Sequence, residues 1–287
     1  MNLSNVDHAP SVRRFRTLRW LWRHPAITLG SLLVGIILLM ALLAPLIASH
    51  DPYTQDLLNT LVPPSAEHWF GTDDYGRDIF SRIVYGARIS VFEVVMSVGI
   101  SLAIGVPLGI VAGLSGRLPD QAIMWLMDVI FAFPGIVLAI LIVSVLGEGL
   151  LNMLIAIALF SVPVYARLSR NLTLSLKSME YVEAAQALGI GYYRIVVHYI
   201  LRNAMGPIIV QSTLTAGTVV LAAASLSFLG LGVQPPTPEW GTMMSDGRNF
   251  LGVNIGVSLF PGLAIVLSVL GFNVLGDGLR DLMDKRS

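Results

Sequence analysis

Long apolar stretches separated by short polar segments run along the whole chain. The first, "AITLGSLLVGIILLMALLAPLIA", extends from Ala26 to Ala48 without a charged residue. A helix needs about 20 apolar residues to cross a bilayer core about 30 Å thick, so this stretch predicts a membrane-spanning helix. The same pattern predicts six spans in all, at residues 27–48, 89–114, 121–146, 150–166, 206–228 and 254–275.

The composition agrees with an integral membrane protein. Hydrophobic residues make up 55% of the 287 residues and charged residues only 13%, about half the charged share of a typical soluble domain. The first apolar stretch is longer than the roughly 7–15 apolar residues of a signal peptide, so we expect it to be retained as a span. We therefore predict an all-α membrane protein with six transmembrane helices.

The basic residues predict the orientation of the spans. If the N-terminus is cytoplasmic, fourteen of the 18 Lys and Arg residues fall in cytoplasmic segments. Cytoplasmic segments of membrane proteins carry such an excess, so we expect both termini inside the cell. The predicted parts are a cytoplasmic tail (1–26), a first helix (27–48), an external loop (49–88), a five-helix core (89–276) with a cytoplasmic loop (167–205), and a cytoplasmic tail (277–287).

Small residues in the second span predict close packing against another helix. Gly105, Gly109 and Gly113 recur at every fourth position. This spacing places them on one helix face, where a second backbone can approach closely.

Two acids, Glu93 and Asp128, lie inside predicted spans. Ionisable groups are costly there and suggest a pore or a proton relay. A structural interpretation is also available and we favour it. Glu93 lies near the outer end of its span and can reach outward or pair with Arg88, while Asp128 lies near the cytoplasmic charges and near the helix-breaking Pro134.

Several functional classes find no support in the sequence. The net charge is zero, which gives no indication of nucleic-acid binding. There is no cysteine, no H-E-x-x-H motif and no G-x-x-x-x-G-K-[ST] phosphate loop, so we expect no enzyme activity and no bound nucleotide or metal on this chain. His50 and His68 share the outer side, but two scattered imidazoles fall short of a usual metal ligand set.

The loop 167–205 contains a predicted short helix. Ser178 is a candidate N-cap, Glu180 and Glu183 would lie in the first turns, and Gly189 is a suitable stop signal. Its small residues suit docking into a groove on a partner protein, although a simple linker helix would have the same composition. For the outer segment 231–253, the sequence allows two interpretations: contact with the membrane surface, or contact with a partner protein.

The motif "EAAQALG" (Glu183–Gly189) resembles the EAA loop of permease subunits in binding-protein-dependent ABC importers. In that family the loop forms a coupling helix that docks on an ATPase subunit. The resemblance assigns this role to Glu183, Ala184, Ala185, Leu188 and Gly189.

The segment "HWFGTDDYGRDIFSRIVYGARIS" (His68–Ser90) resembles the C-type permease subunit of dipeptide, oligopeptide and nickel importers. We expect its Gly, Asp and Arg residues to form a gate or lid over the outer mouth of a pore. The residues assigned to it are Gly71, Thr72, Asp73, Gly76, Arg77, Asp78, Arg82 and Arg88. The family usually has an arginine where Trp125 stands, so no ion-pair role is expected for Asp128.

The resemblance implies the type I ABC importer permease fold in the inner membrane of a bacterium. The chain would form half of a path for di- or oligopeptides or a related small solute. The implied partners are a second permease, two ATPase subunits that bind ATP and Mg²⁺, an external solute-binding protein and membrane lipid. An ion-gradient-driven secondary transporter, with Glu93 and Asp128 as its functional acids, is the alternative.

Overall fold

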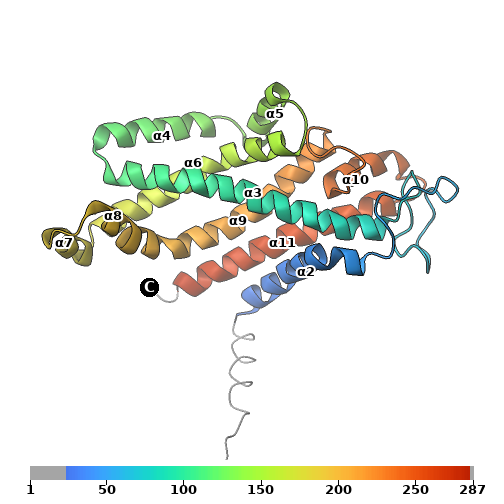
Figure 1. Ribbon diagram of the computed structural model, residues 1–287, viewed down its shortest axis with the longest axis horizontal. Helices are drawn as coiled ribbons and strands as arrows, with labels where there is room; N and C mark the ends of the chain where they lie inside the picture. The colour runs from blue at the N-terminus through green and yellow to red at the C-terminus, as the bar shows by residue number, and fades with distance from the viewer. Residues whose placement is uncertain (1–23, 285–287) are drawn as a thin grey trace, which may run out of the picture.

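The computed structural model describes residues 24–284, and these residues are almost entirely helical, with no β-strand among them (Figure 1). The helices are α2 (Pro25–Ile47), α3 (Ile79–Leu114), α4 (Arg117–Phe131), α5 (Gly135–Leu146), α6 (Leu150–Lys177), α7 (Glu180–Ala187), α8 (Tyr192–Arg194), α9 (Arg202–Phe228), α10 (Trp240–Gly247) and α11 (Gly256–Asp284). A π-helical segment (Ile195–Leu201) joins α8 to α9, and a 3₁₀ turn (Arg248–Phe250) follows α10.

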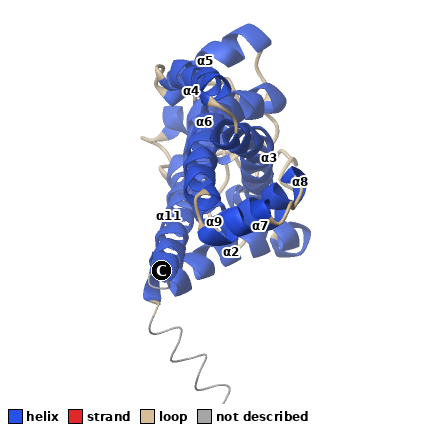
Figure 2. Cartoon of the chain, turned by 90° about the vertical axis from the view of Figure 1, so that its left-hand side faces the viewer, coloured by secondary structure: helices blue, strands red, loops and turns tan. Residues whose placement is uncertain are grey.

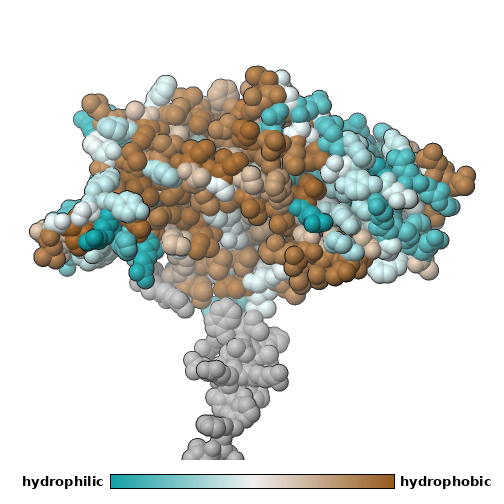
Figure 3. Space-filling view, viewed as in Figure 1, coloured by the Kyte–Doolittle hydropathy of each residue, from teal (hydrophilic) through white to brown (hydrophobic). Residues whose placement is uncertain are grey.

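Five helical runs in the described residues are long and apolar enough to cross a membrane. They are Pro25–Ile47, Ile79–Leu114, Leu150–Lys177, Tyr192–Phe228 and Gly256–Met283. The pair α4 and α5 makes a sixth if it is counted as one broken span. Figure 3 shows a broad apolar band between two more polar ends, as expected for helices that cross a membrane along the long axis of the molecule.

The third predicted span, 121–146, is wrong as a continuous helix. α4 ends at Phe131, α5 begins at Gly135, and the two helices are bent by 88°. Pro134 immediately precedes α5. Proline has no N–H to donate and disfavours helical geometry at the residue before it, so the helix ends and restarts there.

The predicted spans 89–114, 150–166 and 206–228 are shorter than the helices that contain them. α3 begins at Ile79, so the last part of the predicted external loop 49–88 is helical, and α6 continues to Lys177. Apolar composition predicts only the part of a helix that lies within the membrane core, whereas the ends of the helix depend on capping. The Asp78 carboxylate caps α3 by accepting a hydrogen bond from Ser81 N at 2.8 Å.

The charge argument for orientation rests partly on residues outside the described part of the chain. Those residues are Arg13, Arg14, Arg16, Arg19, Arg23, Lys285 and Arg286. The cytoplasmic location of the termini therefore stays a prediction.

The α3 glycines lie directly against α6. A Cβ on Gly105 would lie 2.7 Å from the Val162 carbonyl oxygen, and one on Gly113 would lie 2.7 Å from Thr173 Cβ. A Cβ on Gly109 would meet the Ala166 carbonyl oxygen. Ser101 Oγ also donates a hydrogen bond to Ala158 O at 3.0 Å across the same interface.

The long helices form one bundle, with short elements at its two ends (Figures 1 and 2). The loop 49–78 and α10 lie at one end, and α7 and α8 lie at the other (Figure 1). Trp240, at the start of α10, is buried with 1% of its surface exposed, so it packs inside the end of the bundle that carries the loop 49–78.

Candidate functional sites at the two ends of the bundle

Two glycines shape the loop that leads into α3. Gly71 and Gly76 have φ angles of +77° and +73°, a region that favours glycine. A Cβ on Gly76 would also collide with the carbonyl oxygen of Asp56. Between the glycines, buried Thr72 donates a hydrogen bond to Asn59 O at 2.6 Å and accepts one from Val62 N at 2.9 Å. The G-T-D part of the motif therefore fixes this loop to the segment before it.

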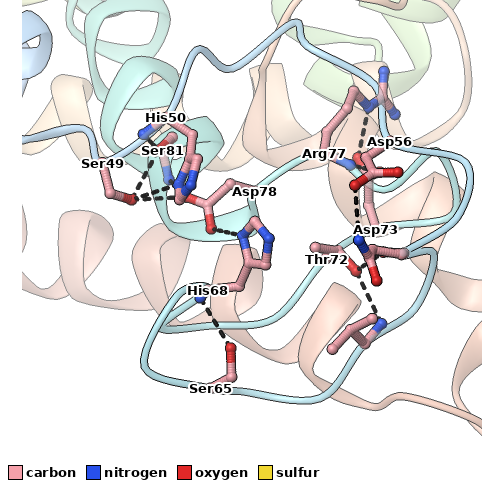
Figure 4. Close-up of polar contacts among 12 residues, drawn as sticks. Ser49, His50, Asp56, Ser65, His68, Thr72, Asp73, Arg77, Asp78 and Ser81 are labelled. Carbon is pink, nitrogen blue, oxygen red and sulfur yellow. Dashed lines mark hydrogen bonds and ion pairs between the residues drawn. The ribbon is translucent and has the colours of Figure 1, made fainter.

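Asp73 and Arg77 form a buried ion pair inside the same loop. Arg77 Nε donates to Asp73 Oδ2 at 2.7 Å, and Arg77 N donates to Asp73 Oδ1 at 2.9 Å. Charge-assisted hydrogen bonds of this kind are stronger than neutral ones. The pair closes a tight turn just before α3 (Figure 4).

Arg82 connects three segments of the outer end. Its Nη1 donates to Pro52 O at 3.1 Å and to Pro236 O at 3.3 Å, and its Nε lies 3.4 Å from Asp73 Oδ2. Only 1% of its surface is exposed. We call the buried set of Thr72, Asp73, Arg77, Asp78 and Arg82 the outer junction, after the external location that the sequence predicts for this loop.

Two further acids lie beside the outer junction. Burial raises the pKa of the half-buried Asp74 carboxyl, and the negative charge of Asp73 raises it further, while Arg77 opposes this rise. Burial likewise raises the pKa of Asp246 in α10, against the opposing effect of Arg77 and Arg82. These acids partly neutralise the two buried guanidinium groups.

Asp78 has two roles in the outer junction. It caps α3, and its Oδ1 lies 3.0 Å from His68 Nδ1 (Figure 4). Arg88, in contrast, is exposed and lies over the Tyr85 ring at 6.0 Å, outside the outer junction. The structure thus brings together most of the predicted gate residues in one buried cluster, and leaves Arg88 out.

At the opposite end, α7 coincides with the predicted coupling helix. Gly189 follows it with a φ of +76°, as its role as a stop signal requires. The predicted N-cap is wrong: Met179 takes this position, while the Ser178 hydroxyl donates to Ser175 O at 2.9 Å. Ser178 therefore ends the preceding helix instead of starting α7.

The α7 residues divide into an exposed edge and a buried face. Glu183 and Ala184 are exposed, as are Leu188 and Gly189 directly after α7, and Leu188 exposes 83% of its surface. Ala185 is buried with Val182, so its side chain is not available for a partner. Val182 packs with Ile195 and Ile200 and attaches α7 to the body of the protein.

The two intramembrane acids have different surroundings. Glu93 is 1% exposed, its Oε1 has no hydrogen-bond partner among the described residues, and it neither reaches outward nor pairs with Arg88. Its electrostatic neighbour is Glu239, the N-cap of α10, which accepts hydrogen bonds from Gly241 N and Thr242 N. Glu93 therefore lies inside the contact between α3 and α10, as a structural residue would.

The expectation that Asp128 lacks an ion pair is wrong. Its Oδ1 accepts a hydrogen bond from Arg167 Nη2 at 2.6 Å, and Arg167 also lies over the Phe131 ring at 4.3 Å. The sequence argument considered only the position of Trp125 on the same helix. The signal that could have found Arg167 was its position at the predicted cytoplasmic end of the next span, at a similar depth.

Comparison of the sequence with known protein families identifies the family of the chain. Residues 105–287 match the family described as "binding-protein-dependent transport system inner membrane component". The chain belongs to this permease family. Residues 14–64 match the N-terminal transmembrane domain of oligopeptide transport permease C.

Relatives of the permease are named for peptide transport. The chain is 50% identical over 257 residues to the dipeptide transport system permease protein DppC of Alkalihalophilus pseudofirmus, covering 90% of this chain and 84% of that protein. It is 47% identical over 277 residues to the glutathione transport system permease protein GsiD of Escherichia coli O6:K15:H31, covering 96% and 89%. It is 40% identical over 277 residues to the probable D,D-dipeptide permease DdpC of Escherichia coli K12, covering 96% and 93%.

The fold of the permease also occurs in a solved importer. A chain of the MetNI methionine ABC transporter in inward-facing conformations superposes with a TM-score of 0.57 at 20% identity, covering 69% of this chain and 94% of that chain. The permease thus has the type I ABC importer permease fold and is a transport subunit, not an enzyme. This family membership decides against the ion-gradient alternative.

Proposed function

We propose that this permease forms one half of the translocation path of a bacterial importer for di- or oligopeptides. The names of its relatives, among them a dipeptide, a D,D-dipeptide and a glutathione permease, all refer to short peptides or a peptide-like solute. The observation that carries the proposal is the group of exposed side chains Leu188, Tyr192 and Tyr193 directly after α7, because an apolar patch exposed at one end of a membrane protein suits a protein partner.

In this proposal a separate ATPase subunit docks on α7 and binds the ATP and Mg²⁺, while this chain binds no cofactor. A second permease completes the pathway, and its ATPase docks in the same way. A solute-binding protein delivers cargo at the end that carries the outer junction. This places α7 and both termini in the cytoplasm and the outer junction outside, where its residues serve as a gate.

The contacts of α7 support a coupling role. Two residues separate α6, which ends at Lys177, from α7, which begins at Glu180. Tyr181 stacks on Tyr199 of the π-helical segment with ring centroids 6.2 Å apart, and Asn203 of α9 donates to Tyr181 Oη at 3.2 Å. A movement of the docked ATPase would therefore reach both α6 and α9 through short, packed connections.

The docking proposal is tested by isolating the permease from native membranes and identifying accompanying subunits by mass spectrometry. We expect Glu183→Lys and Leu188→Ser to reduce the recovery of the ATPase at least tenfold, because both side chains are exposed, the first in α7 and the second directly after it. The matched control is Leu58→Ser, which changes a leucine that is 95% exposed in the loop at the opposite end. Equal ATPase recovery with all three variants would disprove docking on α7.

The substrate proposal is tested by uptake of a labelled dipeptide into cells whose only permease of this type is this chain. Unlabelled tripeptide, glutathione and free amino acids serve as competitors. Uptake that is ATP-dependent and inhibited by peptides supports the proposal. Absence of dipeptide uptake, together with uptake of labelled glutathione in the same cells, would replace peptide with glutathione as the cargo.

A further inference from the structure

Two histidines, which the transport proposal does not use, lie against Asp78 of the outer junction. His50 follows α2, His68 lies in the loop before α3, and Asp78 caps α3. One ligand atom from each of these three residues lies within 4.8 Å of the other two. Figure 4 shows the two imidazoles grouped around the Asp78 carboxylate, apart from the Asp73–Arg77 pair.

We propose that His50, His68 and Asp78 bind a divalent transition-metal cation of the zinc class at the outer end of the permease. Two imidazoles and a carboxylate are a common protein ligand set for zinc, with water in the fourth position. The harder cations Mg²⁺ and Ca²⁺ prefer oxygen ligands and would gain little from the imidazoles.

The distances between the ligand atoms suit such a cation. In a tetrahedral site with bonds of about 2.0–2.1 Å, neighbouring ligand atoms lie about 3.3 Å apart. His68 Nδ1 lies 3.0 Å from Asp78 Oδ1, and His50 Nδ1 lies 3.9 Å from Asp78 Oδ2. Because one ligand atom from each residue lies within 4.8 Å of the other two, rotations of the three side chains would bring these atoms to tetrahedral spacing. The two imidazole centroids are already 4.7 Å apart.

Neighbouring groups hold the three ligands in place. Ser81 N donates to Asp78 Oδ2 at 2.8 Å, and Ser49 Oγ donates to the same oxygen at 3.3 Å. Ser81 Oγ accepts a hydrogen bond from His50 N at 3.0 Å, which fixes the backbone of that residue. Outer contacts of this kind orient metal ligands and strengthen metal binding.

The charge and the exposure of the cluster also fit a cation. The ion pairs of Asp78 in the described residues are with His50 and His68, and Arg77 and Arg82 are instead directed to Asp73. The Asp78 side chain is fully buried, whereas the His50 side chain is 37% exposed and leaves a route from solvent. A bound cation would connect the end of α2, the His68 loop and the start of α3.

The test is a Zn²⁺ titration of the full-length permease, isolated with the subunits that accompany it through a tag without histidine, after treatment with a chelator. We expect one additional Zn²⁺ per permease, an increase in apparent Tm on binding, and visible absorption bands of four-coordinate Co²⁺ when Co²⁺ replaces Zn²⁺. His50→Ala should weaken this binding by roughly tenfold or more, because one of three ligands is lost. His198→Ala is the matched control, since His198 is an exposed histidine far along the chain.

Asp78→Asn provides a second variant that keeps the fold, because asparagine caps a helix about as well as aspartate. It should likewise weaken binding of the additional Zn²⁺ by roughly tenfold or more while the cap of α3 remains. An unchanged Zn²⁺ affinity in either His50→Ala or Asp78→Asn, or the absence of the additional Zn²⁺ from the wild-type permease, would overturn the proposal. In that case the His68–Asp78 contact is a structural hydrogen bond only. The outcome does not depend on transport activity, so the proposed function stands or fails separately.

Discussion

The indole Nε1 of Trp240 donates a hydrogen bond to the carbonyl oxygen of Ile83 at 3.0 Å, although 157 positions separate the two residues. The contact brings the start of α10 onto the outer part of α3. Gly86, which lies one turn further along α3, makes room for the indole ring. A Cβ on Gly86 would lie 2.6 Å from Trp240 Nε1 and 2.7 Å from Trp240 Cδ1.

Replacement of Gly86 by alanine should therefore displace Trp240. We expect Gly86→Ala to destabilise the permease by about 1–3 kcal/mol, the usual cost of overpacking a well-packed site. Gly99→Ala is the control, because Gly99 lies on the same helix with nothing within 4 Å of its added Cβ. The measurement is the apparent Tm in detergent, with tryptophan fluorescence as a local probe. Equal Tm values for the two variants would show that α10 does not need this close approach.

Arg82 should not be replaceable by lysine. Lysine keeps the charge but lacks the planar fork that reaches Pro52 O, Pro236 O and Asp73 at once. We expect Arg82→Lys to lower the stability markedly and Arg82→Ala to cost about 3–5 kcal/mol, because Asp73 loses a buried partner. Arg88→Lys, at an exposed position on the same helix, is the control and should be nearly neutral. Chemical denaturation in micelles would measure both.

Asp74→Asn should stabilise the permease near neutral pH. Burial raises the folded pKa of Asp74 above the ordinary value of 3.8, so folding disfavours the ionised carboxylate. This cost is present above the folded pKa and disappears as the pH falls through it towards 3.8. The stability advantage of Asp74→Asn should therefore be larger at pH 7 than at pH 4.

Asp56→Asn is a control of opposite sign for the pH experiment. The side chain of Asn59 lowers the pKa of Asp56, since it donates a hydrogen bond to the carboxylate at 2.8 Å. The stabilising contribution of the ionised Asp56 carboxylate is present above pH 3.8 and is lost as the pH falls through the lowered folded pKa. Asp56→Asn should thus destabilise the permease at pH 7 and less so in acid. The measurement is the apparent Tm of each variant relative to the wild type from pH 3 to pH 7. If this Tm difference changed with pH in the same direction for both variants, the argument would be contradicted.

Removal of Asp128 alone should be more harmful than removal of both partners of its ion pair. Asp128→Ala leaves the Arg167 guanidinium without its carboxylate on a largely apolar helix surface, whereas the double variant with Arg167→Ala leaves no unpaired charge there. A double-mutant cycle on apparent stability in lipid nanodiscs measures the coupling. A coupling near zero would mean that water already screens the pair.

The sequence was sufficient for the features that depend on composition and on spacing along one helix. The apolar stretches, the glycine strip of α3 and the stop at Gly189 are of this kind. The bend at Pro134 could also have been predicted, because "FPG" is a strong helix-breaking signal. The sequence was insufficient for contacts between segments that are distant in the chain. The Asp128–Arg167 pair, the burial of Trp240 and the third member of the histidine cluster could not, since each depends on how the helices are arranged.

The length of α3 has a mechanical consequence. Its 36 residues span about 54 Å at about 1.5 Å per residue, whereas a bilayer core is only about 30 Å thick. One continuous helix therefore has the outer junction at its start. Near its end, the Gly113 carbonyl accepts a hydrogen bond from Lys177 of α6 at 2.7 Å. Lys177 is the last residue of α6 before α7. A force applied at α7 would thus reach the end of α3 through Lys177 and travel along one continuous helix to the outer junction, with Pro107 as the position where that helix can bend.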